Sequence, residues 1–159
     1  MSKPKKSWRE KLADSKGLPK VETIDEKCMS ARWGSGTFVI PAPLEVDGVM
    51  RQVPKGKLIT IDEIRKILAR KHGANIACPI TTGIFAWIAA HAADEAASQG
   101  EKRITPYWRT LKTRGELNPK YPGGIENLKA RLTSEGHQIV QKGKRYLVRD
   151  FERSLVALE

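Results

Sequence analysis

Hydrophobic residues recur at the spacing of an α-helix in three stretches of the chain, with start or stop signals beside them. The clearest stripe consists of Ile61, Ile64, Ile67 and Leu68. Thr60 precedes this stripe with Glu63 three residues later, which is the spacing of a capping box, and Gly73 closes it. A second stripe consists of Leu44, Val46, Val49, Met50 and Val53. A third consists of Ile125, Leu128 and Leu132, and Gly136 follows it where a left-handed cap would lie. The pattern predicts three amphipathic helices.

A stretch rich in alanine predicts a fourth, longer helix over residues 83–98. Thr81 or Thr82 would cap its N-terminus, because a threonine hydroxyl accepts a hydrogen bond from a free backbone amide there. Its alanine, threonine and glycine residues would let this helix approach a backbone or a groove closely, and packing inside the core is the alternative. A last short helix would follow Asp150.

The first 22 residues are basic and contain helix-breaking residues. Ser7 would cap a short helix that carries Trp8, and residues 23–33 predict another short helix. We expect Trp8 to dock on the rest of the protein. The lysines of this segment fit either an arm that reaches a nucleic-acid backbone or a solvated tail.

Short β-prone runs complete the chain, at residues 37–40 and 58–59 and on either side of a basic loop at 141–145. The runs at 138–140 and 146–148 predict a β-hairpin around that loop. Its tip would carry Lys142, Lys144 and Arg145. A hairpin after a set of helices is typical of a winged-helix arrangement. The sequence therefore predicts an α+β, mostly helical fold with a basic wing.

The charge of the chain favours a polyanionic partner. The formal net charge is +11 and the isoelectric point about 9.8. Residues 102–149 hold twelve basic and three acidic residues, which predicts one basic face. Such a face attracts phosphate backbones, although small basic proteins without that role exist. No apolar run is long enough to span a membrane, and Cys28 and Cys78 suggest no disulfide framework, so we expect a cytoplasmic protein.

Residues 105–137 resemble a known family. They contain Pro106, Arg109, Gly115, Gly123, Gly124, Glu135 and Gly136 in sequence. This order is similar to the active-site segment of the C-terminal domain of alkylguanine-DNA alkyltransferases, the methylated-DNA–protein cysteine methyltransferases. Tyr107 and Trp108 stand where that family has its acceptor cysteine and its histidine. The chain therefore resembles the non-catalytic alkyltransferase-like type. The resemblance covers about residues 44–148.

The resemblance implies a basic extension at residues 1–40 and a DNA-binding domain at 41–159. The helix at Gly83 would be the recognition helix, with Ile80 in the position of the family's intercalating arginine. Ile61 would occupy the position of a tyrosine that turns a nucleotide out of the duplex, although its place in the apolar stripe also fits a core residue. The DNA-contacting residues would be Ile80, Thr81, Thr82, Gly83, Arg109, Arg114, Lys142, Lys144 and Arg145.

The resemblance also implies a base pocket at Tyr107, Trp108 and Arg109, because aromatic walls suit a flipped base. The alternative is that the two bulky aromatic residues fill and close that pocket. Double-stranded DNA is the expected partner, with RNA or a protein as the alternatives and no membrane.

The residues suggest binding rather than catalysis. No pattern of histidine, cysteine or carboxylate predicts a metal site, a cofactor or a catalytic group. The first hypothesis is a DNA-binding protein without alkyl-transfer activity, with alkylated guanine as the candidate lesion. The second is a basic adaptor that binds RNA, DNA backbone or a protein nonspecifically. The third is a methyltransferase that uses Cys78, and a small buried thiol is the ordinary alternative there.

Overall fold

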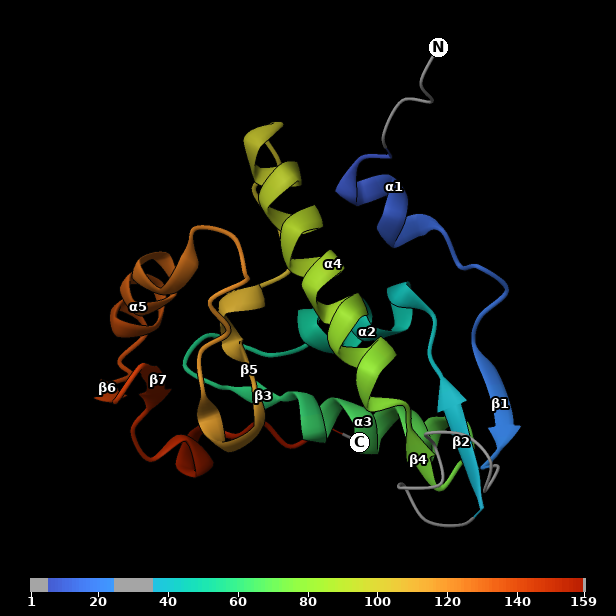
Figure 1. Ribbon diagram of the computed structural model, residues 1–159. Coiled ribbons are helices and arrows are strands. Elements are labelled where there is room, and N and C mark those ends of the chain that lie inside the picture. Colours follow the sequence, from blue (N-terminus) through green and yellow to red (C-terminus); the bar gives the residue numbers. More distant parts are fainter. Residues whose placement is uncertain (1–5, 25–35, 159) are drawn as a thin grey trace.

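A computed structural model describes residues 6–24 and 36–158 (Figure 1). The helices are α1 (Trp8–Ala13), α2 (Pro43–Arg51), α3 (Ile61–Lys71), α4 (Pro79–Ser98) and α5 (Gly124–Ser134). The strands are β1 (Lys20–Thr23), β2 (Thr37–Ile40), β3 (Ile59–Thr60), β4 (Ile76–Ala77), β5 (Thr110–Leu111), β6 (Ile139–Lys142) and β7 (Arg145–Val148). Short 3-10 turns are η2 (Tyr107–Arg109), η3 (Thr113–Gly115) and η4 (Phe151–Ser154). The fold is α+β and mostly helical, as the sequence predicted.

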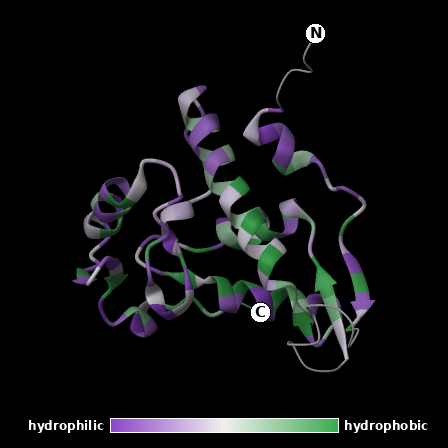
Figure 2. Cartoon of the chain, viewed as in Figure 1, coloured by the Kyte–Doolittle hydropathy of each residue, from purple (hydrophilic) through white to green (hydrophobic). Residues whose placement is uncertain are grey.

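Helix α4 runs through the middle of the molecule, and α1, α2 and α3 pack against it (Figure 1). Hydrophobic residues concentrate along the lower part of α4 and on strand β2 (Figure 2). Several small side chains of α4 are fully or almost fully buried, among them Ala86, Ala89, Ala90 and Ala93. Because alanine adds little bulk, the neighbouring helices can approach the α4 backbone closely. The alanine-rich stretch is therefore a packing surface along most of its length.

The strands form three small sheets rather than one. Strand β2 pairs with β1 in antiparallel and with β4 in parallel orientation. Strands β3 and β5 form a two-residue parallel pair, which brings the start of α3 beside the segment after η2. Strands β6 and β7 form the predicted hairpin, in which Lys142 pairs with Arg145 across a two-residue loop.

Three helix ends follow their sequence signals. The Thr60 hydroxyl accepts a hydrogen bond from the Glu63 amide at 3.3 Å, and that of Ser7 caps α1. Gly136 has a φ of +94°, and the amides of Gly136 and His137 donate to the carbonyls of Thr133 and Leu132. That pair of bonds is a Schellman motif, which satisfies carbonyls at the end of α5.

The start of α4 differs from the prediction. The helix begins at Pro79, four residues before Gly83, and Cys78 takes the N-cap position. Proline at the first helical position has the required φ and lacks an amide that would be unsatisfied there. The prediction that Thr81 or Thr82 caps the helix is wrong, because both lie inside its first turn. The Thr82 hydroxyl instead donates to the Cys78 carbonyl at 2.6 Å.

Two other predicted helices also differ. Of the helix predicted over residues 23–33, only the first two residues are described, and neither is helical, because Thr23 belongs to strand β1 and Ile24 has no regular structure. The other residues of that prediction lie outside the described residues. After Asp150 the chain makes only the 3-10 turn η4, without a side-chain cap. The segment then pairs with the main body, since Leu155 forms a β-bridge with Leu58. Within the described residues, no helix is long and apolar enough to cross a membrane.

Candidate nucleic-acid interface

The first two turns of α4 present an apolar outer surface. Ile80 is 54% exposed and Ile84 is 45% exposed, although most large apolar residues of the chain are buried. The two residues are four positions apart, so they share one face of the helix, with Gly83 beside them. Thr82 is fully buried and faces the core, so it does not have the predicted DNA-facing position. The Thr81 hydroxyl is buried and has no hydrogen-bond partner among the described residues.

A cavity of about 250 Å³ lies beside this helix face. Its lining residues are Ile61, Gly83, Lys112, Thr113, Glu116, Asn118 and Tyr121. Ile61 is the first residue of α3 and Gly83 lies in the second turn of α4, and the other residues come from the loop that contains η3. The cavity therefore combines apolar walls with an ammonium, a carboxylate and an amide. Burial raises the pKa of Tyr121 against the opposing effect of an Asn118 hydrogen bond, so its phenol stays neutral.

Tyr107, which belongs to the segment of the family resemblance, lies in the core next to this cavity. Tyr107 is 1% exposed, and its ring makes edge contacts with Trp108 and Tyr121 at centroid distances of 5.2 and 6.3 Å. Its hydroxyl accepts a hydrogen bond from the Asn127 amide at 3.0 Å. The aromatic residues thus fill the space at this position, which matches the closed alternative. A base pocket at Tyr107–Arg109 stays a prediction that would require these side chains to move.

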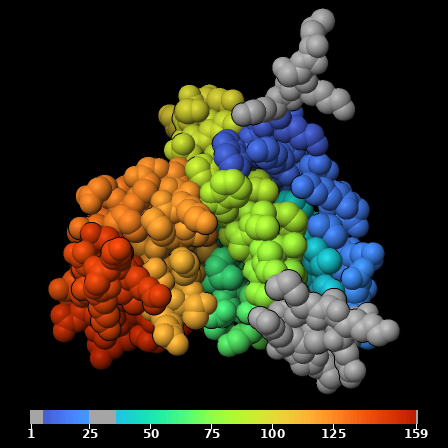
Figure 3. Space-filling view, viewed as in Figure 1, coloured from blue at the N-terminus to red at the C-terminus, as the bar shows by residue number. Residues whose placement is uncertain are grey.

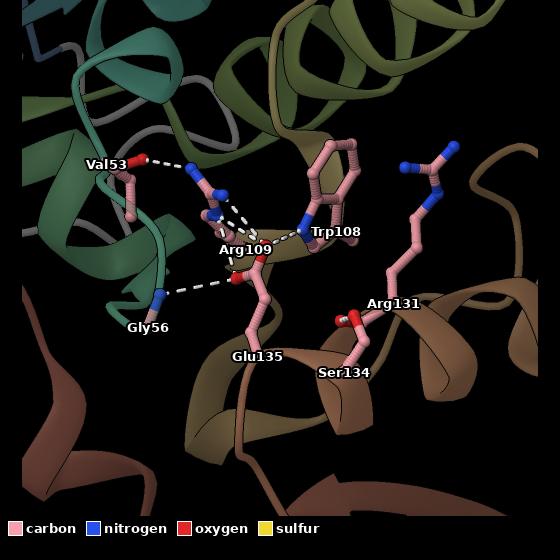
Figure 4. Close-up of polar contacts among 7 residues, drawn as sticks. All are labelled: Val53, Gly56, Trp108, Arg109, Arg131, Ser134 and Glu135. Carbon is pink, nitrogen blue, oxygen red and sulfur yellow. Dashed lines mark hydrogen bonds and ion pairs between the residues drawn. The ribbon is translucent and has the colours of Figure 1, made fainter.

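Glu135, at the end of α5, joins three separate segments of the chain (Figure 4). Its carboxylate accepts hydrogen bonds from the Trp108 indole at 2.9 Å, from the Arg109 guanidinium at 2.8 and 2.9 Å, and from the Gly56 amide at 3.4 Å. The same guanidinium donates to the Val53 carbonyl at 2.7 Å. Burial would raise the pKa of Glu135, but the bonds from Arg109, Trp108 and Gly56 outweigh it and hold that pKa below its usual value.

This arrangement gives Arg109 a different role from the predicted one. Its side chain is only 13% exposed and that of Glu135 is 6% exposed, so the ion pair is largely removed from solvent. A guanidinium committed to a carboxylate and a carbonyl inside the protein is not available to a phosphate. Sequence reasoning missed the role of Glu135, which it treated as part of a helix end. It also missed Arg131, whose guanidinium lies 4.3 Å from the centroid of the Trp108 ring.

The hairpin and the η3 turn form a basic groove of about 890 Å³. Its cationic lining residues are Arg114, Lys142, Arg145 and Arg149, and they outnumber its two acidic ones, Asp150 and Glu152. Among the described residues, the first three have no acidic partner within 4 Å, and Arg149 has only the distant, exposed Asp150 at 4.0 Å. Lys144 is exposed at the tip of the loop. Arg114, Lys142, Lys144 and Arg145 are therefore accessible, as a role in binding would require.

Comparison with solved structures finds alkyltransferase-like proteins among the structural neighbours. One is Atl1 of S. pombe in complex with damaged DNA containing O6-carboxymethylguanine, with 20% sequence identity and a TM-score of 0.48. Another is ATL of S. pombe in complex with DNA, with 19% identity and a TM-score of 0.47. Each match covers 73% of this chain and 94% of the other. The sequence matches no protein-family model and no curated protein. The likeness concerns the fold alone.

Proposed function

We propose that the protein binds duplex DNA through the first two turns of α4, with the hairpin as a basic wing of a winged-helix domain. The observation that carries the proposal is the exposed pair Ile80 and Ile84 beside a cavity whose other wall bears Lys112. Two large apolar side chains exposed one turn apart suit insertion between bases, since apolar wedges unstack base steps. In this proposal residues 41–159 form the DNA-binding domain, and residues 1–40 extend it.

The cavity is the proposed site for an altered base, with alkylated guanine as the candidate lesion. A volume of about 250 Å³ equals roughly eight waters at about 30 Å³ each, which is enough for one flat ring system. Ile61 and Tyr121 would contact the faces of the ring, and Lys112, Glu116 and Asn118 would supply polar contacts at its edge. This placement moves the base site from Tyr107 to the neighbouring cavity.

We propose further that the protein performs no alkyl transfer. Transfer needs a thiolate at the site of the alkyl group, and Tyr107 and Trp108 carry no thiol. Cys78 is 5% exposed and occupies the N-cap position of α4, so its thiol is largely closed to a ligand. A bound lesion would therefore remain intact.

One observation favours a second candidate function, a basic adaptor that binds a nucleic-acid backbone without recognising a base. Tyr107 and Trp108 fill the position where the family resemblance places the base, while Arg114, Lys142 and Arg145 in the groove have no acidic partner within 4 Å among the described residues. A protein of that kind would use only the basic groove, and RNA would satisfy it as well as DNA.

The test is fluorescence-anisotropy binding to a duplex with one O6-alkylated guanine and to its unmodified twin, over a series of salt concentrations. Tighter binding to the modified duplex that persists as salt rises is the expected result. Equal binding that disappears with salt would leave only backbone electrostatics and favour the adaptor. No binding to either duplex would refute the proposal.

Matched variants separate the two contributions to binding. Ile80→Ala removes three carbon groups from the side chain, and we expect about half of their surface to be buried against the DNA. Duplex binding should therefore weaken about five- to tenfold. Leu44→Ala is the control, since Leu44 is 53% exposed on another helix. Arg145→Ala should lower the slope of log affinity against log salt by about one. Arg70→Ala removes the same charge at an exposed position of α3 and should leave the salt slope unchanged.

A further inference from the structure

An aromatic cluster joins the N-terminal helix to the middle of α4. The ring of Trp8 stacks on His91 at a centroid distance of 4.5 Å and meets the ring of Trp87 edge-on at 4.8 Å. Trp87 and His91 also contact each other at 5.3 Å. Helix α1 lies directly against α4, on the side that Figure 3 shows. The expectation that Trp8 docks on the rest of the protein is thus confirmed.

Two rings of this cluster hold one backbone carbonyl of a distant loop. The Trp87 indole donates to the Lys120 carbonyl at 3.2 Å, and the His91 Nε2 lies 3.0 Å from the same oxygen. Because a carbonyl only accepts, the His91 Nε2 must carry the proton in this contact. The Lys120 carbonyl belongs to the tight turn of residues 118–121, in which the Tyr121 amide donates to the Asn118 carbonyl.

Helix α1 is anchored by its backbone as well as by Trp8. The amides of Trp8 and Arg9 donate to the Glu95 carboxylate at 3.1 and 3.3 Å, so a side chain of α4 caps α1 from outside. The cations of α1 and its approach are engaged within the protein. Lys6 pairs with Asp14, Arg9 bonds to Gln99, and the Lys11 ammonium lies 4.4 Å from the Trp8 ring centroid. Each of these three cations therefore has a partner within the protein.

We infer that Trp8 is a positioning residue for the cavity beside α4. It fixes the rings of Trp87 and His91, these rings hold the Lys120 carbonyl, and the turn then places Asn118 and Tyr121 at the cavity wall. The chain of contacts links the N-terminal extension to the width of the cavity, although Trp8 does not line it. The functional use of this link rests on the proposed function, whereas the link itself does not.

Amide hydrogen exchange tests the link without any ligand. The reporters are the amides of Lys120, Tyr121 and Gly124, which all donate within or just after the turn. Trp8→Ala should raise their exchange rates about fivefold through loss of the aromatic contacts. Trp8→Phe should restore slow exchange, because phenylalanine can still stack on His91. The amides of Gly136 and His137, in the α5 cap, are the controls and should not change.

Trp87→Phe provides a second variant in which packing is kept and one hydrogen bond is removed. It should also accelerate the three turn amides, and Trp8→Ala added to it should have a smaller effect than alone, because the two act through the same turn. Unchanged turn amides in Trp8→Ala would overturn the inference. Equal acceleration of the turn and the α5 cap would overturn it too, since it would show only a general loss of stability.

Duplex binding tests the functional half of the inference. Trp8→Ala should reduce the preference for the modified over the unmodified duplex and leave the salt slope unchanged. A loosened turn with an unchanged preference would refute a role of Trp8 in serving the cavity. If the wild-type protein binds neither duplex, the proposed function fails, and the exchange result still decides whether Trp8 positions the turn.

Discussion

Removal of the Glu135 carboxylate should be among the most destabilising single changes in this protein. Glu135→Ala leaves the Arg109 guanidinium, whose side chain is 13% exposed, without its charge partner. It also leaves the Trp108 indole and the Gly56 amide without their acceptor. Loss of one partner from a buried ion pair costs about 3–5 kcal/mol, because the remaining charge is still buried. Small domains have about 5–15 kcal/mol of stability in total, so the loss would be large.

The assay is equilibrium unfolding in urea, followed by tryptophan fluorescence. With a slope of about 1–3 kcal/mol per molar urea, the loss corresponds to a fall of about 1–5 M in the midpoint. The control is Glu63→Ala, which removes an exposed ion pair with Lys66 and should cost less than about 1 kcal/mol. The double variant Glu135→Leu with Arg109→Met should recover much of the loss, because no unpaired charge remains. A Glu135→Ala protein within 1 kcal/mol of the wild type would refute the reasoning.

Two further predictions concern pH and backbone geometry. Burial lowers the pKa of His137 below its usual value of about 6.5, and the pKa of Glu135 is also lowered, so the unfolded chain binds more protons than the folded one on acidification. The free energy of unfolding should therefore be highest at neutral pH and fall progressively below about pH 6.5, as measured by urea unfolding at each pH. His137→Asn should reduce the fall in the part of this pH curve nearest pH 6.5. Gly115 and Gly136 both have a positive φ, but only at Gly115 would a Cβ atom meet the ring of Phe151. Gly136→Ala should cost about 1 kcal/mol and Gly115→Ala about 1–3 kcal/mol more in thermal or urea unfolding, and equal costs would contradict this account.

The sequence predicted those helices whose ends carry local signals. The cap at Thr60 and the glycine stop at Gly136 both depend on residues within a few positions of one another, so a pattern along the chain is enough to find them. The start of α4 was misplaced because Thr81 and Thr82 also resemble capping residues. Pro79 gave the competing signal, and its fit to the first helical position decided the outcome.

The candidate site was predicted only in part, for a related reason. Cations at the hairpin tip were predicted to be accessible, because a short loop between two β-prone runs exposes its side chains. The fate of Arg109 was not predictable in the same way, since it depends on a carboxylate 26 residues later and a carbonyl 56 residues earlier. Trp8 likewise meets its partners on α4 only in three dimensions. Contacts of this kind leave no local pattern in the sequence.

The residues that carry the family resemblance most clearly are, in this structure, residues that hold the fold together. Arg109 and Glu135 form the buried pair, Gly136 completes the α5 cap, and Gly115 makes room for a ring. The positions that face the proposed DNA, Ile80 above all, depart from the family pattern. The sequence resemblance therefore predicts the architecture and does not identify the ligand. The two sets of variants should therefore separate: changes at Glu135 should alter unfolding, and changes at Ile80 should alter binding at unchanged stability.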